Sequence, residues 1–272
     1  MRDRVMKMMT EIEIRWRAPL DWEHLAGFLS RRAIPGVESF DVDGYTRAGI
    51  RVRRDGRRRR FVASVPPGVD ATEAGVRIAR MFDAAADSRS IAARLGRDPM
   101  LRPLLDRHRG IRVPGGWDAF EIVIRAIVGQ QISVAAARSI VGSIAGKCGE
   151  RTNGSLSFPT AAQIVSSKLE LGMPRRRLES IRAVSAAVAS GAFALEKRST
   201  LEETISALEE LPGIGPWSAS YIAMRGLGET DAFPAGDLIL RRNAGMTEQQ
   251  LTRRAERWRP YRAYAAMLLW AK

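Results

Sequence analysis

The sequence is poor in thiols and imidazoles, since its 272 residues include one cysteine, Cys148, and two histidines, His24 and His108. A single cysteine excludes an internal disulfide and an iron–sulfur cluster, which needs several thiolates. The two histidines lie in unrelated sequence contexts, so we expect no metal held by side chains. No apolar run is long enough to cross a membrane, and residues 1–9 lack a signal-peptide core. We therefore expect a reduced, cytoplasmic protein with no membrane partner.

Acidic residues are also scarce relative to basic ones. Lys and Arg total 44 against 30 Asp and Glu, which gives a formal net charge of +14 and a pI near 11.0. This excess favours a polyanionic partner, namely DNA, RNA or an acidic membrane face. An arginine-rich proteome is the alternative source. At 45% hydrophobic residues, the chain can bury a sizeable core shared by two or three structural units.

The first part of the sequence predicts a small α+β unit with an antiparallel sheet. Apolar and polar residues alternate over 11–17, as in an edge strand, and short alternating runs broken by glycine follow over 39–65. Helices are expected over 21–32 and 72–82. The four arginines at 57–60 indicate a hairpin tip, which is either a solvated strand end or a phosphate contact.

From residue 87 onward the signals are almost all helical, so the predicted fold class is mainly α with an N-terminal α+β domain. Residues 110–116 form a linker. Three arginines at 175–177 begin one helix, where they either contact phosphate or are simply solvated. We expect helices over 88–95, 100–105, 117–129, 133–147, 174–190, 201–210, 238–243 and 260–270, one that begins at Pro216 and one capped by Thr247 with Gln250.

A glycine-rich turn joins two of these helices. Pro212 and Gly213 end the first helix, and Pro216 suits the first turn of the next. The hairpin between them consists of Gly213, Ile214 and Gly215. Without Cβ atoms on the glycines, a phosphate can approach the backbone and take hydrogen bonds from N–H groups at the second helix's positive end. A helix–helix turn without a ligand is the alternative.

A carboxylate follows this hairpin. Asp237 lies in the turn Asp231–Asp237, at the expected N-cap of the next helix. The positive end of that helix favours an ionised side chain. A cap and a functional carboxylate are compatible roles for the same residue.

The pattern L-P-G-I-G-x-W-[ST]-A-x-Y at 211–221, followed by D-x-F-x-x-x-D at 231–237, resembles the helix-hairpin-helix (HhH-GPD) DNA glycosylases. Within them it resembles the bacterial 3-methyladenine DNA glycosylase II (AlkA) type, over most of the chain. The resemblance implies that family's fold, in which two helical domains flank the active-site cleft. The corresponding domains are residues 1–85 (α+β), residues 113–230 (wedge loop and hairpin), and residues 86–112 plus 231–272 (catalytic Asp).

The resemblance also implies roles for particular side chains. Asp237 becomes the catalytic carboxylate, which stabilises an oxocarbenium-like sugar once the base leaves. Four aromatic residues become candidates for the base pocket, where cation–π attraction favours a cationic alkylated base. These are Trp217, Tyr221, Trp270 and Phe28. Core packing is the alternative for each of them.

The loop at 129–134 resembles the family's wedge, which fills the gap left by an extruded nucleotide. The AlkA type carries leucine there, whereas this chain has Gln131, with Gln130 and Ile132 beside it. A polar loop between two helices is the alternative. The resemblance implies that the hairpin at 213–215 binds the DNA backbone and allows a monovalent cation at its backbone carbonyls, with no other cofactor.

Trp217 distinguishes two mechanisms. Family members that also cut the strand have a lysine at the matching position, which forms a Schiff base. No lysine lies between Lys197 and Lys272. The expected activity is therefore monofunctional: the enzyme releases the base, leaves an abasic site and has no AP-lyase activity. The implied partner is double-stranded DNA with damaged bases, bound by a monomer in the bacterial cytoplasm and at the nucleoid when acting.

Two departures from the AlkA type concern the pocket. Leu238 and Ala271 stand where that type has aromatic residues. A roomier, less aromatic pocket follows as a hypothesis. Two other functions remain open at this point: a glycosylase for other damaged bases, and a non-catalytic helix-hairpin-helix DNA-binding protein. A basic helical DNA-binding regulator is the more remote possibility, because Asp237 would then be only a cap.

Overall fold

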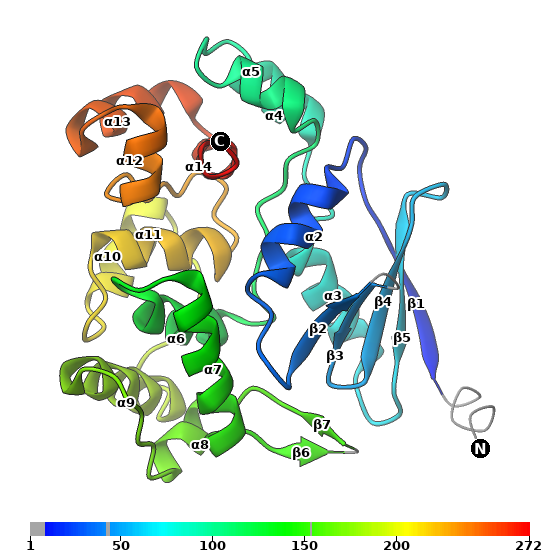
Figure 1. The fold of residues 1–272 in the computed structure, drawn as a ribbon, viewed down its shortest axis with the longest axis vertical. Helices are drawn as coiled ribbons and strands as arrows, with labels where there is room; N and C mark the ends of the chain where they lie inside the picture. The colour runs from blue at the N-terminus through cyan, green and yellow to red at the C-terminus, as the bar shows by residue number, and fades with distance from the viewer. Residues whose placement is uncertain (1–8, 42–43, 153) are drawn as a thin grey trace.

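An antiparallel five-stranded sheet forms the N-terminal part of the computed structural model, which describes residues 9–41, 44–152 and 154–272 (Figure 1). Its strand order is β1–β5–β4–β3–β2. The strands are β1 (Thr10–Arg15), β2 (Glu38–Asp41), β3 (Gly44–Arg47), β4 (Ile50–Asp55) and β5 (Arg60–Val65). The prediction of an antiparallel sheet with a hairpin tip at the arginine run is confirmed, because residues 57–59 lie in the turn between β4 and β5 and Arg60 begins β5.

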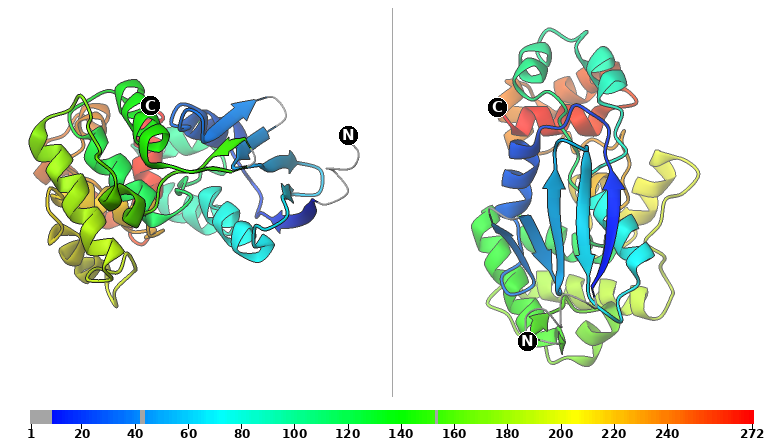
Figure 2. Two further views of the ribbon diagram at one scale, coloured as in Figure 1. Left: turned by 90° about the horizontal axis from the view of Figure 1, so that it is seen from below. Right: turned by 90° about the vertical axis from the view of Figure 1, so that its right-hand side faces the viewer.

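Two helices, α2 (Trp22–Ser30) and α3 (Ala71–Met81), cover one face of this sheet. The carboxylates of Asp21 and Asp70 cap them by accepting hydrogen bonds from backbone N–H groups. Leu25 and Ile78 are fully buried against the sheet, as is Phe61 of β5. The right-hand view in Figure 2 shows the opposite face of the sheet, with the helices behind it.

The remainder of the described chain is largely helical and shares a second hydrophobic core. Helix α6 lies at its centre, in contact with α7, α9 and α11, and Ile122, Ile124 and Ile127 on it are fully buried. The helices are α4 (Ser88–Leu95), α5 (Arg102–Arg107), α6 (Ala119–Gly129), α7 (Val134–Cys148), α8 (Ala161–Ser166), α9 (Arg175–Ala189), α10 (Leu201–Glu209), α11 (Pro216–Arg225), α12 (Leu238–Ala244), α13 (Glu248–Ala255), the short η1 (Glu256–Trp258) and α14 (Arg262–Trp270).

The segment between α7 and α9 contains elements that the sequence did not lead us to expect. A two-stranded hairpin of β6 (Arg151–Thr152) and β7 (Ser155–Leu156) precedes α8. Strands of two residues are too short to show an alternating pattern. Helix α8 does carry a readable signal, since Thr160 and Gln163 form a capping box at its start.

The α4–α5 segment packs against the last helices of the chain (Figure 1). The carboxylate of Asp98 accepts hydrogen bonds from Arg254 at 2.5 and 3.1 Å and from the Trp258 indole at 2.8 Å. Arg94 Nε donates to the carbonyl of Arg259 at 2.6 Å. These contacts join segments far apart in the sequence; the domain boundaries named above stay a prediction.

A buried cluster of charges joins the sheet to α6. The Arg47 guanidinium lies 2.9 Å from Glu38 and 2.5 Å from Glu121, and the Arg125 guanidinium lies 2.7 Å from Glu38 and 2.6 Å from Glu121. We call these four residues the sheet–α6 cluster. Burial alone would raise the pKa of Glu38, but the Arg125 and Arg47 guanidiniums outweigh it and lower that pKa to about 2.

The two histidines lie together, so the interpretation that their contexts are unrelated was wrong. Their ring centroids are 5.1 Å apart, and His108 Nδ1 lies 2.9 Å from an Asp21 carboxylate oxygen. The amide of Asp21 donates to the carbonyl of Gly110, which holds α2 against the segment after α5. Burial lowers the pKa of His24. Among the described residues, no group of three or more His, Cys, Asp or Glu side chains is placed to hold a metal ion, and no helix is long and apolar enough to span a bilayer.

Candidate active site

The site is built around Asp237, whose carboxylate caps α12 and receives two indole N–H groups. Its Oδ1 accepts from the amides of Ile239 and Leu240, both at 2.9 Å, and from Trp270 Nε1 at 3.1 Å. Its Oδ2 accepts from Trp217 Nε1 alone, at 2.9 Å. Oδ1 is therefore saturated with donors, whereas Oδ2 keeps a free lone pair for a further ligand.

Three of the four aromatic candidates surround this carboxylate. Trp217 and Tyr221, one turn apart on α11, stack with centroids 5.4 Å apart and planes at 18°. Trp270, at the end of α14, meets Tyr221 edge-on at 6.3 Å. All three are partly exposed. The two tryptophans thus act both as aromatic walls and as hydrogen-bond donors that orient Asp237, and the sequence pattern had indicated only the first role.

Phe28, the fourth candidate, lies behind this group. It is 3% exposed, and the Arg32 guanidinium covers its ring at 3.7 Å from the centroid. The Arg225 guanidinium lies 4.9 Å from the same centroid. Phe28 supports the pocket through these guanidiniums; direct contact with a base stays a prediction.

Arg225 is a functional candidate that the sequence reasoning missed. It is 2% exposed, and its Nη1 donates to the Tyr221 hydroxyl at 2.5 Å while its Nε donates to the carbonyl of Pro114 at 2.7 Å. Burial alone would raise the pKa of the Tyr221 phenol, but the Arg225 and Arg32 guanidiniums lower it. The signal available in the sequence was a charged residue at the end of the apolar run Ile222–Met224, one turn after Tyr221.

The hairpin has the geometry expected from its sequence. Gly213 has φ +81°, and a Cβ there would lie 2.2 Å from Ser180 Oγ of α9, so glycine is required for both reasons. Ile214 is 6% exposed and packs in the helical core. Gly215 precedes α11, and a Cβ there would meet no atom within 4 Å. A side chain at Gly215 would therefore point into open space directly before α11.

The wedge loop contacts the hairpin through Gln130. Its Nε2 donates to the carbonyl of Gly213 at 2.9 Å and to Ser218 Oγ at 3.1 Å. Gln131, the next residue, is exposed and has φ +60°, a conformation uncommon for residues other than glycine. Ile132 is partly buried against the helical core. The hydrogen bonds of Gln130 thus hold the loop against the hairpin, while the adjacent Gln131 is exposed.

Apolar and basic residues flank the site. Leu238 and Ile239, directly after Asp237, are 72% and 47% exposed, which is unusual for large aliphatic side chains. At the start of α9, Arg175 and Arg176 are exposed. Ser180 places that helix against the hairpin at Gly213.

Comparison with known proteins agrees with this arrangement. Residues 11–118 match the family model for the AlkA N-terminal domain, and residues 124–258 match that for HhH-GPD superfamily base excision DNA repair proteins. The chain is 33% identical to DNA-3-methyladenine glycosylase 2 of Escherichia coli over 94% of this chain and 95% of that protein.

Two solved structures extend the comparison. A 3-methyladenine DNA-glycosylase from Archaeoglobus fulgidus aligns with a TM-score of 0.75 over 95% of this chain and 97% of that one. At 21% identity, this match shows the fold alone. A 3-methyladenine DNA glycosylase from Schizosaccharomyces pombe, in complex with abasic DNA, aligns at 25% identity and a TM-score of 0.57 over 67% of this chain and 95% of that one.

Proposed function

Because the chain belongs to the HhH-GPD superfamily of base excision DNA repair proteins, we propose that it is a monofunctional DNA glycosylase for alkylated purines. It extrudes a base of the 3-methyladenine or 7-methylguanine type from duplex DNA, hydrolyses the N-glycosidic bond and leaves an abasic site. The observation that carries this proposal is the partly free Oδ2 of Asp237 between two indole rings.

The proposed chemistry follows from the asymmetry of this carboxylate. As the C1′–N bond breaks, its electron pair neutralises the cationic base, and positive charge develops on the sugar. Asp237, fixed by four N–H donors, stabilises that charge without reorganising. A water molecule then forms the new C1′–O bond, while Oδ2 accepts its proton and later releases it to solvent.

The aromatic walls favour the cationic leaving group. A cation over the ring of tryptophan or tyrosine gains about 0.5–2 kcal/mol per good contact, whereas a normal neutral base gains no such term. Trp217, Tyr221 and Trp270 supply these rings. The exposed Leu238 and the small Ala271 support the hypothesis of a roomier pocket, which a base-release profile matching that of the AlkA type would refute.

The similar S. pombe glycosylase, solved in complex with abasic DNA, supports DNA as the binding partner. The hairpin at 213–215 holds a phosphate, and Gln131 fills the space of the extruded nucleotide. A monovalent cation at the hairpin carbonyls, action as a monomer, and a place at the bacterial nucleoid complete the proposal. Trp217 in place of a Schiff-base lysine supports the absence of AP-lyase activity.

The decisive experiment compares the wild type with Asp237→Asn on a duplex containing 7-methylguanine. Asparagine caps a helix as well as aspartate does, so stability and DNA affinity should stay within about twofold of wild type. The charge that stabilises the sugar is lost, and base release should slow by about 10²–10³-fold. The wild-type product strand should remain intact until hot alkali cleaves it.

The same assay separates the other functions. A wild type that binds the duplex but releases no alkylated base would support a non-catalytic DNA-binding protein with Asp237 as a cap only. Release of oxidised or deaminated bases in place of alkylated ones would support a glycosylase of different range. Strand cleavage without alkali would contradict the monofunctional mechanism.

A further inference from the structure

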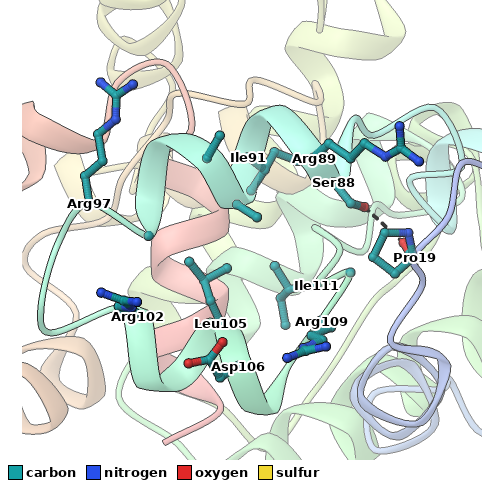
Figure 3. A pocket seen from close by; sticks show the side chains of 14 residues that line it. Pro19, Ser88, Arg89, Ile91, Arg97, Arg102, Leu105, Asp106, Arg109 and Ile111 are labelled. Carbon is teal, nitrogen blue, oxygen red and sulfur yellow. Dashed lines mark hydrogen bonds between the residues drawn. The ribbon is translucent and has the colours of Figure 1, made fainter.

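A concave site lies on the α4–α5 hairpin, and no residue of the hairpin at 213–215, the wedge loop or α12 lines it (Figure 3). Its volume is about 510 Å³. Its apolar floor consists of the exposed Pro19, Ala92 and Ala93, with the nearly buried Ile91, Leu105 and Ile111 beneath them. Of its lining residues, only Asp106 is acidic and none is aromatic.

Four exposed arginines line this pocket, two at each end. Because α4 and α5 are joined by the short turn at 96–101, Arg97 and Arg102 lie at the turn end of the pocket, and Arg89 and Arg109 lie at the other (Figure 3). At 1.5 Å per residue, the eight residues of α4 separate the two pairs by about 12 Å.

Some surface arginines of the described chain pair with carboxylates and others do not. Arg77, Arg175 and Arg259 each pair with a carboxylate. In the part of the chain that the structure describes, none of the four pocket arginines has a carboxylate within ion-pair distance. Four unpaired cations around an apolar floor attract a ligand with negative charge at both ends and an apolar group between them.

We propose that this pocket docks an acidic segment of a partner protein, in which one large aliphatic side chain is flanked by carboxylates. Five extended residues span about 16 Å, enough to place carboxylates at both arginine pairs while the central side chain occupies the floor. Arginine forks bind carboxylates in bidentate geometry. This docking site goes beyond base excision and is independent of Asp237.

Two other ligands fit the pocket less well. A nucleotide base needs an aromatic platform on which to stack, and the lining residues offer none. A DNA backbone is bound by arginines without an apolar floor, so Ile91, Leu105 and Ile111 would gain nothing from that contact. A peptide uses both the charge and the apolar surface.

The test measures fluorescence anisotropy of a labelled acetyl-Glu-Asp-Leu-Asp-Glu-amide peptide with the full chain. Arg97→Glu combined with Arg102→Glu should weaken binding about tenfold or more. Arg57→Glu combined with Arg58→Glu, on the exposed β4–β5 turn, is the matched control, since it changes net charge equally; its effect should stay within about twofold. Ala92→Trp, which fills the pocket from an exposed lining position without changing charge, should weaken binding as well.

A peptide with serine in place of leucine should bind at least about fivefold more weakly, because it leaves the floor unfilled. Equal losses in the two double variants, or equal affinity for the serine peptide, would show non-specific charge attraction and overturn the proposal. So would a loss of affinity for undamaged duplex confined to the pocket variants, which would make this surface a DNA contact. Base release should be unchanged in all of them, which separates this result from any failure of the glycosylase assay.

Discussion

At the scale of single residues, Asp237 shows how one side chain meets structural and chemical demands together. The two backbone donors of α12 both bind Oδ1, so capping uses one oxygen and leaves the other for chemistry. The indoles are divided between the two oxygens, with Trp270 on Oδ1 and Trp217 on Oδ2. Oδ2, the oxygen that the proposed mechanism uses, therefore has Trp217 as its single hydrogen-bond donor among the described residues.

This asymmetry predicts unequal effects of two matched substitutions. Trp217→Phe keeps a ring but removes the only donor to Oδ2, whereas Trp270→Phe removes one of three donors to Oδ1. A hydrogen bond to a charged group is worth about 1.5–3 kcal/mol, so we expect Trp217→Phe to slow single-turnover base release about tenfold. Trp270→Phe should slow it less. Equal rates for the two variants would contradict the assignment of Oδ2.

Some of these residues could be predicted from the sequence and others could not. Asp237, Trp217 and Tyr221 match a spaced motif, Trp270 follows from the wider family resemblance, and the structure brings the four together. Arg225 was missed because its partners, the carbonyl of Pro114 and the ring of Phe28, come from distant parts of the chain. Periodicity within a helix indicates which face is buried but not which distant atoms meet it.

At the scale of elements, the hairpin contains two glycines with different physical requirements. Gly213 is needed by the fold, through its positive φ and its contact with Ser180. Gly215 is not needed by the fold, since its φ is −104° and its surroundings are open. Glycine is a common N-cap residue, and in the proposed function its missing side chain also lets a phosphate approach the start of α11.

Alanine at each position separates these requirements. Gly213→Ala should lower the free energy of unfolding by about 1–3 kcal/mol, through backbone strain and the clash with α9. Gly215→Ala should leave the free energy of unfolding within about 0.5 kcal/mol of wild type while weakening duplex binding several-fold. Thermal unfolding and duplex affinity, measured on both variants, test this. Unchanged duplex affinity in Gly215→Ala would contradict phosphate binding at this hairpin.

Several element boundaries were predicted from their caps, although the capping box of α8 was missed. Asp21, Asp70, Thr200 and Thr247 each cap a helix close to its predicted start. The segment with β6 and β7 carries no comparable signal. The pairing order of the sheet and the packing of α4–α5 on α14 depend on contacts across the chain, which local pattern does not encode.

At the scale of the whole molecule, the sheet–α6 cluster connects the α+β part to the helix that leads into the wedge loop. Glu38 and Arg47 come from the sheet, and Glu121 and Arg125 from α6. Removing one member of such a buried network leaves the others without partners, which is more costly than losing a surface ion pair.

This cluster predicts an acid-dependent loss of stability. The pKa of Glu38 is about 2 in the folded protein, below its ordinary value of 4.5. A lowered carboxyl pKa stabilises the folded state above pH 4.5, and this contribution is lost as the pH falls from 4.5 towards 2. Glu38→Gln should therefore be less stable than wild type at pH 7, and the difference should shrink below pH 4.5. Denaturant unfolding at several pH values tests this, and a constant difference would contradict it.

The ion pair between Asp98 and Arg254 joins two segments that the ribosome synthesises at different times. The two residues are 156 positions apart, so at roughly 5–20 residues per second a ribosome needs roughly 8–30 s to pass from one to the other. Throughout that interval the apolar faces of α4 and α5 lack the helices that cover them. The nascent chain also lacks Trp270, which helps to orient Asp237. The hydrogen bonds around Asp237 are therefore incomplete until α14 has been synthesised.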